Sequence, residues 1–562
     1  MAGTILTPNA IWKNFKTDGK IGAEVISEKK SGGIVFSNLL IEGRKVKDGV
    51  VEIFGTIAKK AQLSVAPAIL VLCDLNETVD ETLITDLANR GYTVLAIDVA
   101  GQAEGKENFT VYPESLSHAR YENVKDDLLT IKGDVRNTCW YEWTAAARIA
   151  LQYLKNQPQV TDVGAIGIGE AATVLWQVAG TDQNLSCAVF AFNAGWRGYR
   201  GIQKFGGMVE PQFSDNMYKF IAGVEPQAYA MHVKCPTLML SATNSKTYDV
   251  DRAFDTVSRI GEGVYKAVNY SVNHTRRISD EAYNTATLFL EEFLIKGAKE
   301  NCNLPKESEI KCEISDGEIV LEVIPDENGL KEVCIYASEQ MTDSAFRSWN
   351  KVSSYKKTDG VYKFKYNPYP ESGIVVAFAK CVYKNGFAIN SKIVAKKFEA
   401  KEVKPLYKSN IIYSSRIKDA ESCFSTTGRT MQSFVDFGGK CNVKVKKGPM
   451  GIEGVTCQGG LRSFMVGTDK NRPMDGAMLM LDVYAKNQSQ LEVRLIEDYF
   501  GQRTEYIATV NILGGDVWHN VQLEANRFKT VEGRSLKSYE RISVLEINVL
   551  GADYLINNAL WV

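Results

Sequence analysis

Ala-Ile-Gly-Ile-Gly-Glu-Ala-Ala, residues 165 to 172, is the stretch that decides the fold of this chain. The residues from Val163 to Ile168 form a short apolar run, as expected of a strand buried on both faces. Small residues follow, which allow a helix to approach the end of the strand closely, and residues 173 to 179 have the composition of that helix. The stretch therefore predicts a strand, a sharp turn and a helix.

Strands and helices alternate on both sides of this unit. Buried-type strands are expected at residues 67–73, 91–98, 186–192 and 236–241, and helices at 80–90, 143–155 and 280–296. This alternation predicts an α/β domain with a doubly wound, mainly parallel sheet over residues 30 to 298.

In this context, residues 167 to 171 fit the frame of a nucleophile elbow, G-x-S-x-G, a turn that presents a serine above a parallel sheet. Residues 30 to 298 resemble the α/β-hydrolase superfamily, and within it the dienelactone hydrolase and acetyl xylan esterase-type carboxylesterases. The resemblance implies a carboxylic ester hydrolase fold with a triad in the order nucleophile, acid, base. The segments that carry it are residues 90–98, 98–101, 167–172, 235–238 and 273–274.

Three positions depart from the pattern of that family. Gly169 stands at the nucleophile position, so the serine is absent, and Ser245 stands where the family places its acidic residue. Asp249 lies just downstream and is the candidate substitute acid. The loop at residues 74–77 is acidic and lacks glycine, so it would oppose the negative charge that an oxyanion loop normally stabilises.

Two positions keep the pattern. The resemblance places the catalytic base at His274, which we interpret as vestigial because a base needs a hydroxyl to deprotonate and an acid to orient it. We expect His274 to lie within about 10 Å of Gly169, since both loops belong to the carboxyl edge of the sheet. Glu170 follows the nucleophile position, where the backbone N–H contributes to the oxyanion hole. A lone histidine also has an ordinary structural interpretation.

Beyond residue 298 the pattern changes to strands alone. We predict three domains: 1–298 as described, 299–403 as an Ig-like β-sandwich with Trp349 in its core, and 404–562 as a second all-β domain. The last domain resembles the galactose-binding-type jelly rolls of carbohydrate-binding modules. Residues 514–523 and 556–562 carry that resemblance.

Polar residues on two strands of the last domain are candidate ligand-binding residues. Alternation places Asp482 and Tyr484 on one face of a strand, and Glu492 and Arg494 on one face of the next. An aromatic ring could stack on a sugar while the charged groups bond its hydroxyls. Any half-exposed antiparallel strand shows the same pattern, so the structural interpretation stays open.

Composition excludes several classes of protein. The chain has 562 residues with 66 basic and 67 acidic side chains well mixed, and no basic stripe favours nucleic-acid binding. No apolar run approaches the roughly 18 residues of a membrane span, and no signal peptide is visible. Eleven scattered cysteines are typical of reduced thiols and argue against a zinc site. We therefore expect a cytoplasmic protein without metal or cofactor, although an exported protein lacking its leader would look the same.

Three functions are consistent with the sequence. The favoured hypothesis is a catalytically impaired pseudo-esterase whose β-rich tail binds a glycan or a protein. The alternative is an active carbohydrate esterase of the dienelactone hydrolase or acetyl xylan esterase type with a rearranged site. The third is a structural protein that uses its β domains as interfaces.

Overall fold

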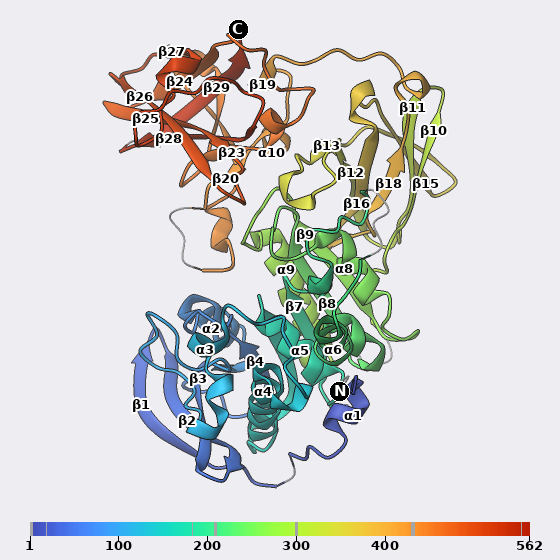
Figure 1. The fold of residues 1–562 in the computed structure, drawn as a ribbon, viewed down its shortest axis with the longest axis vertical. Coiled ribbons are helices and arrows are strands. Elements are labelled where there is room, and N and C mark those ends of the chain that lie inside the picture. The colour runs from blue at the N-terminus through green and yellow to red at the C-terminus, as the bar shows by residue number, and fades with distance from the viewer. Residues whose placement is uncertain are drawn as a thin grey trace. The chain divides into compact units, whose positions relative to one another are not determined.

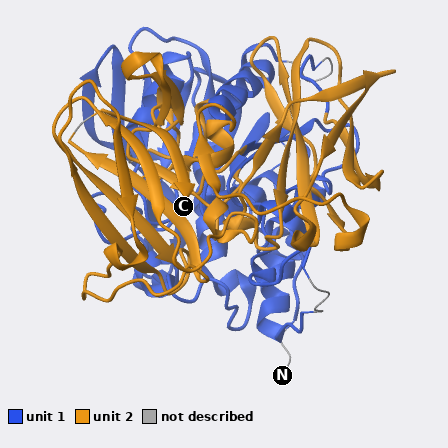
Figure 2. Ribbon diagram, turned by 90° about the horizontal axis from the view of Figure 1, so that it is seen from above, with its two compact units in different colours: residues 1–241, 247–270, 281–306 blue, residues 242–246, 271–280, 307–562 orange. Residues whose placement is uncertain are grey.

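The computed structural model describes residues 4–17, 19–182, 184–206, 211–297, 302–428, 433–551 and 553–562 (Figure 1). These residues form two compact units (Figure 2). Unit 1 comprises residues 1–241, 247–270 and 281–306, and unit 2 comprises 242–246, 271–280 and 307–562. The predicted domain boundary at residues 298 and 299 lies outside the described residues.

A nine-stranded mixed sheet forms the centre of unit 1, in the order β1-β2-β3-β5-β4-β6-β7-β8-β9. The strands β5, β4, β6, β7 and β8 pair in parallel, which confirms the α/β sheet predicted from the alternation. The strands β1 to β3 add an antiparallel extension that the sequence analysis did not predict. The strands are β1 (Ala23–Ser31), β2 (Ile34–Val46), β3 (Gly49–Lys60), β4 (Ala66–Leu72), β5 (Thr93–Ile97), β6 (Val160–Ile168), β7 (Cys187–Ala191), β8 (Thr237–Ala242) and β9 (Lys266–Ser271).

Helices cover both faces of this sheet. A Cβ on Gly164 would meet Leu294, which follows α9, whereas a Cβ on Gly167 would meet Leu175 of α5. Because residues three apart on a strand point to opposite faces, α5 and α9 lie on opposite sides of β6. The helices are α1 (Pro8–Trp12), α2 (Glu81–Asn89), η1 (Glu114–Ala119), α3 (Tyr121–Val124), η2 (Val135–Asn137), α4 (Cys139–Lys155), α5 (Ala171–Ala179), η3 (Arg197–Tyr199), α6 (Asp215–Gly223), α7 (Pro226–Tyr229), η4 (Ala230–His232), α8 (Val250–Val257), α9 (Asp280–Leu290) and η5 (Glu291–Ile295).

Residues 309 to 397 of unit 2 form two antiparallel sheets, with the orders β10-β11-β15-β14 and β13-β12-β16-β17, and β18 pairs with β16. Trp349 is fully buried and its ring packs edge-on against Phe378, so the prediction that it is a core residue is confirmed. The strands are β10 (Glu309–Ser315), β11 (Glu318–Ile324), β12 (Leu330–Glu339), β13 (Asn350–Val352), β14 (Tyr355–Thr358), β15 (Val361–Tyr366), β16 (Ile374–Tyr383), β17 (Ala388–Asn390) and β18 (Val394–Lys397), with the short helices η6 (Ser344–Phe346), η7 (Pro370–Ser372) and η8 (Ala400–Glu402).

Residues 411 to 561 form two further sheets, β21-β22-β29-β24-β27 with β19 beside β29, and β20-β23-β28-β25-β26. Alternate residues of β24 and β25, such as Leu481 and Val493, share one apolar core, so the two sheets pack face to face. The Ig-like and jelly-roll types stay predictions. The elements are β19 (Ile411–Ser414), α10 (Ala420–Cys423), β20 (Ser425–Thr426), η9 (Phe437–Gly439), β21 (Lys444–Lys447), η10 (Pro449–Gly451), β22 (Glu453–Thr456), β23 (Leu461–Ser463), η11 (Met465–Gly467), β24 (Leu479–Ala485), β25 (Ser489–Glu497), β26 (Thr504–Ile512), β27 (His519–Leu523), η12 (Ala525–Arg527), β28 (Ile542–Leu550) and β29 (Tyr554–Trp561).

Within the described residues, no helix combines the length and apolar character that crossing a membrane requires.

Candidate functional site

The turn between β6 and α5 has the backbone of a nucleophile elbow. Gly169 follows β6 directly with φ +58°, a conformation that favours glycine. Its N–H donates to the carbonyl of Ala191 at the end of β7 (3.0 Å). Gly167, two residues earlier within β6, must also be small, because a Cβ there would lie 2.9 Å from the Cα of Ala172 in α5. The small residues therefore bring strand and helix together as the sequence predicted.

The side chain of Asp74 occupies the place where a nucleophile would stand on Gly169. A Cβ built on Gly169 would lie 2.6 Å or less from all three atoms of the Asp74 carboxyl group. Asp74 follows β4, the neighbour of β6 in the sheet. The elbow thus lacks its hydroxyl and has a carboxylate from the next loop in the same space.

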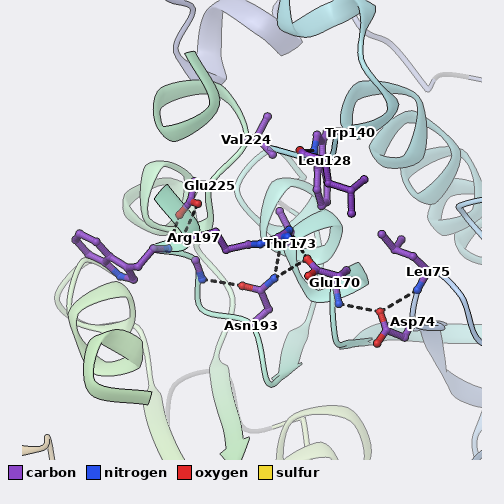
Figure 3. A network of polar contacts seen from close by, with 12 residues as sticks. Asp74, Leu75, Leu128, Trp140, Glu170, Thr173, Asn193, Arg197, Val224 and Glu225 are labelled. Carbon is purple, nitrogen blue, oxygen red and sulfur yellow. Dashed lines mark hydrogen bonds and ion pairs between the residues drawn. The ribbon is translucent and has the colours of Figure 1, made fainter. Parts of the chain in front are cut away.

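The same carboxylate accepts two backbone hydrogen bonds (Figure 3). Asp74 Oδ1 accepts from the N–H of Leu75 (2.8 Å) and from the N–H of Glu170 (2.9 Å). In the family that the sequence resembles, the residue after the nucleophile and the loop of this strand supply the oxyanion-hole donors. The carboxylate of Asp74 therefore bonds to the two N–H groups that the resemblance would assign to an oxyanion hole.

A buried ion pair holds the loop after β4 in this position. Lys106 Nζ donates to the carbonyl of Leu75 (2.6 Å) and to Asp98 Oδ1 (2.8 Å), and the lysine side chain is only 1% exposed. Asp98 Oδ2 in turn accepts from the N–H groups of Gly101 (2.8 Å) and Thr110 (2.9 Å). The charges of Lys106 and Asp98 are thus compensated by each other and by the backbone. Asp98 belongs to the segments that carry the family resemblance, but its pairing with Lys106 was not predicted from the sequence.

The side chain of Glu170 points away from Asp74 and into a polar cluster. Its Oε2 pairs with Arg197 Nη1 (2.5 Å) and accepts from Asn193 Nδ2 (3.2 Å). Burial raises the pKa of Glu170 to about 7, with further upward contributions from Asp74 and Glu225 and a downward one from Arg197. The backbone N–H of Glu170 faces the elbow, as expected from the sequence. There it donates to the carboxylate of Asp74.

The loop after β7 completes the cluster. Asn193 Nδ2 also donates to Thr173 Oγ1 (2.8 Å), which ties this loop to α5. Glu225 is fully buried and accepts from the N–H groups of Trp196, Arg197 and Gly198. These contacts hold Trp196 at φ +64°. The residue types of this loop carry no periodic or motif signal, so Asn193, Arg197 and Glu225 were not predicted.

The two candidates for the triad acid lie in different settings. Ser245 is buried in the loop after β8, which belongs to unit 2. Its neighbour Asn244 donates to the carbonyls of Ala345 (3.0 Å) and Arg347 (2.6 Å). Asp249 begins α8 as its N-cap, accepts from the N–H of Asp251 (3.0 Å) and pairs with Arg252.

His274 lies in the loop after β9, which is also part of unit 2. Burial lowers its pKa to about 4, and the charges of Arg277, Arg462 and Lys380 lower it further. No carboxylate within the described part of the chain forms an ion pair or hydrogen bond with its imidazole. Because Gly169 belongs to unit 1, the expected proximity of the two residues stays a prediction.

The loop that carries His274 is fixed by its neighbour Asn273. Asn273 Nδ2 donates to the carbonyls of Trp349 (3.2 Å) and Glu421 (2.9 Å), and its Oδ1 accepts from the N–H of Trp349 (3.1 Å). Asn273 has φ +59°, which asparagine tolerates better than most residues. The loop that carries His274 is therefore held to the backbone of unit 2 by hydrogen bonds.

The four candidate sugar-binding residues fall on two sheets. Asp482 and Tyr484 lie on β24, in the sheet with β29, whereas Glu492 and Arg494 lie on β25, in the sheet with β28. Asp482 accepts from Asn520 (2.8 Å) and Asn558 (2.7 Å). Arg494 pairs with Glu492 (2.8 Å) and with Glu505. The structure does not bring the two pairs together into one site.

The chemistry of the elbow follows from these contacts. Residue 169 has no hydroxyl or thiol, and the N–H groups of Leu75 and Glu170 are both bonded to Asp74. Within the described residues, no group of three or more His, Cys, Asp or Glu side chains is arranged to hold a metal ion.

No model of a known protein family matches the chain, and no curated protein matches it. Solved structures that resemble it include the acetyl xylan esterase from Paenibacillus sp. R4, with 15% identity, a TM-score of 0.39, and coverage of 50% of this chain and 91% of the other. Acetyl xylan esterase 1 from Thermoanaerobacterium sp. JW/SL YS485 has 14% identity, a TM-score of 0.38, and coverage of 51% and 95%. The glucuronoyl esterase from Solibacter usitatus has 13% identity, a TM-score of 0.35, and coverage of 50% and 90%. These three solved structures are esterases, and each aligns with about half of this chain.

Proposed function

We propose that this protein is a catalytically impaired, esterase-like α/β-hydrolase whose β-rich part binds a carbohydrate or a protein ligand. The observation that carries the proposal is the carboxylate of Asp74, which fills the nucleophile position and bonds to both oxyanion-hole donors. A site of this kind has no hydroxyl or thiol to attack an ester and no free donors to stabilise the oxyanion.

Each of these two losses is costly by itself. Removing one oxyanion-hole donor from a working enzyme slows turnover by about 10² to 10³. Removing a triad member costs more, because the triad acts as a unit. Asp74 also places a negative charge where negative charge develops in the transition state. The site therefore opposes ester hydrolysis electrostatically as well as by the absence of a nucleophile.

The other half of the triad supports the same proposal. Asp249 is engaged as a helix cap and in an ion pair with Arg252, so it cannot orient a base without giving up those bonds. Burial, with the charges of Arg277, Arg462 and Lys380, lowers the pKa of His274, which disfavours the imidazolium that a general base must form.

An assay of ester hydrolysis tests the proposal. The purified full chain should hydrolyse p-nitrophenyl acetate at the rate of buffer and should not react with a fluorophosphonate probe. The single variant Gly169→Ser should stay inactive because its new side chain meets Asp74. Steady turnover by the unmodified chain that is lost in His274→Ala would contradict the proposal.

One observation favours the alternative, an active carbohydrate esterase with a rearranged site. The carboxylate of Asp74 stands at the nucleophile position and could itself attack the ester carbonyl, releasing the alcohol and leaving an acyl-aspartyl anhydride for water to hydrolyse. The variant Asp74→Asn separates the two functions. Under the alternative it abolishes a measurable activity, whereas under our proposal there is no activity for it to abolish.

A further inference from the structure

A cavity of about 430 Å³ lies in the part of unit 2 that residues 411 to 561 form, remote in sequence from the elbow. Its volume is within the range of about 300 to 1,000 Å³ that is typical of ligand pockets. The described part of its wall includes three lysines, Lys440, Lys444 and Lys446, and one carboxylate, Asp553. The wall therefore carries an excess of positive charge.

The edge strand β21 directs two of these lysines to the same side. Lys444 and Lys446 are alternate residues of this strand, so their side chains leave the same face from Cα atoms about 7 Å apart. Thr456, which pairs with Lys444 across the two strands, also lines the cavity. Lys447 leaves the opposite face of β21 and is not part of the wall.

No neighbouring side chain pairs with the three ammonium groups. Among the described residues, the side chains of Lys440, Lys444 and Lys446 form no ion pair, hydrogen bond or cation–π contact. By contrast, both lysines of β15 pair with glutamates of the adjacent strand (2.6 and 2.7 Å). A cleft lined by charge of one sign raises the local concentration of ions of the other sign. The cavity should therefore attract anions.

Lys444 also acts on the buried residues next to it. Burial raises the pKa of the Cys457 thiol in the wall to about 11, and the charge of Lys444 opposes this shift. Burial likewise raises the pKa of Asp436, and the charge of Lys444 again acts in the opposite direction. The carboxylate of Asp436 forms no ion pair with Lys444 and accepts instead from the N–H of Cys441 (2.6 Å). The position of a direct anionic partner for Lys444 is thus left to a ligand.

Three primary amides add hydrogen-bonding groups to the wall. Asn442, Gln458 and Asn548 line the cavity, and each is at least partly exposed. Their side chains form no hydrogen bond with any residue that the structure describes. An amide donates through its nitrogen and accepts through its oxygen, so these groups can bond both oxyanions and hydroxyl groups of a ligand.

The composition of the wall narrows the class of anion. Tyr554 is the one aromatic residue among its described members, and it is 6% exposed with its hydroxyl bonded to the carbonyl of Cys457 (3.2 Å). The described wall therefore presents no aromatic face on which a nucleobase could stack. It also contains no arginine, whose planar guanidinium binds a planar carboxylate through two parallel hydrogen bonds. Lysines act as point charges, which select a ligand by its number of negative charges.

We propose that this cavity binds a compact polyanion, a small molecule that carries two or more phosphate or sulfate groups. The oxyanions pair with Lys440, Lys444 and Lys446, and the three amides bond the other oxygen atoms of the ligand. The inference goes beyond the proposed function and does not depend on the chemistry of the elbow.

Isothermal titration calorimetry of the full chain tests the class of ligand. At least one of inositol hexakisphosphate and sucrose octasulfate should bind, and comparison of the two shows whether phosphate or sulfate is the charged group. Orthophosphate, with a single oxyanion, should bind at least about tenfold more weakly, and uncharged inositol should not bind. Raising the NaCl concentration from about 0.05 M to about 0.5 M should weaken the binding, because salt screens exposed charges.

Three results of this titration would overturn the proposal. They are the absence of binding by both polyanions, binding of orthophosphate as tight as that of the polyanions, and tighter binding of a single-stranded oligonucleotide than of either polyanion. The last result would assign the cavity to a nucleic acid.

Variants of β21 assign the binding to the cavity. Lys444→Met and Lys446→Met should each weaken binding of the polyanion about tenfold, and Gln458→Leu should weaken it about threefold. The matched control is Lys447→Met, which removes the same charge from the opposite face of the same strand and should change the affinity less than about twofold. An equal loss in Lys447→Met and Lys444→Met would show attraction to net charge alone and would overturn the assignment.

Melting temperatures show whether the variants fold. They should match that of the unmodified chain, because the substituted lysines are exposed. The polyanion should raise the melting temperature of the unmodified chain and of Lys447→Met, but not that of the double variant Lys444→Met, Lys446→Met. Unchanged affinity in the folded lysine variants would overturn the assignment to this cavity. None of these measurements depends on ester hydrolysis, so failure here and failure of the pseudo-esterase proposal are distinguishable.

Discussion

The turn after β6 and the loops after β8 and β9 follow strands of one sheet. They differ in which residues and contacts stand where the family resemblance expects catalytic residues. The turn keeps the elbow backbone, with Gly169 at φ +58°, and has a carboxylate where the hydroxyl would be. The loops after β8 and β9 keep one side chain of the pattern, His274, while Asn244 and Asn273 bond to the backbone of unit 2. Under our proposal, one catalytic position is filled by a side chain from a neighbouring loop, and the other lies in a loop that is hydrogen-bonded to the backbone of unit 2.

The largest expected effect comes from restoring the nucleophile. Gly169→Ser should lower the free energy of unfolding by about 3 kcal/mol, because the new side chain is strained at positive φ and collides with Asp74. Chemical denaturation measures this difference. Gly32→Ser is the matched control, since Gly32 has φ +56° with open space around it, and should cost only about 1 kcal/mol.

A double variant separates strain from collision. In the double variant Gly169→Ser, Asp74→Gly, the collision is removed. The destabilisation caused by Gly169→Ser should therefore shrink toward that of Gly32→Ser. If the two substitutions are simply additive, Asp74 does not occupy the nucleophile position.

The next effect in size is the pH dependence caused by Glu170. Its pKa is about 7 in the folded chain because of burial, compared with the ordinary 4.5. The folded state therefore holds the proton more tightly, and stability should fall by up to about 3 kcal/mol as pH rises from about 4.5 to about 7. Glu170→Gln should flatten the denaturation profile in this window. A variant with the same slope as the unmodified chain would assign the slope to other groups.

A somewhat smaller effect should come from the loop after β9. Asn273→Ala should destabilise the chain by about 2 kcal/mol, since it removes three hydrogen bonds to the backbone of unit 2. His274→Ala, one residue away, should cost less than about 1 kcal/mol. Chemical denaturation of both variants compares the stability contributed by Asn273, which holds the loop, with that contributed by His274 at the base position of the family pattern. A larger loss in His274→Ala would reverse our interpretation of this loop.

The last expected effect, which is confined to acidic pH, is the titration of His274. Its pKa of about 4 lies below the ordinary 6.5, so the folded state favours the neutral ring, and the stability that it contributes is lost only as pH falls from about 6.5 to about 4. NMR should show no inflection of its ring protons between pH 5 and 8. A titration near pH 7 would indicate a carboxylate partner and revive a base at this position.

The sequence predicted the parallel part of the sheet because apolar runs such as residues 163–168 alternate with helical patterns that end in small residues. It did not predict β1, every residue of which is exposed, because an edge strand without an apolar face leaves no periodic signal. It also predicted that the loop at residues 74–77 would oppose an oxyanion. It could not place Asp74 against Gly169, because the two residues are 95 positions apart and only the order of β4 and β6 in the sheet brings them together.

The polar contacts around Glu170 could not be predicted from the sequence either. Arg197 and Asn193 follow β7 in an irregular loop, and their contacts depend on backbone angles that no spacing rule encodes. For Asp482, Tyr484, Glu492 and Arg494, alternation gave the correct exposed face of each strand. It could not show that the two strands belong to different sheets, because consecutive strands usually pair.

The central claim is that Asp74 fills the elbow and leaves no working nucleophile. The most direct test compares the initial rates of p-nitrophenyl acetate hydrolysis by the unmodified chain and by Asp74→Asn. Our account predicts that both proteins match the buffer rate, because neither has a hydroxyl at residue 169. Turnover by the unmodified chain that disappears in Asp74→Asn would contradict the account and identify Asp74 as the nucleophile.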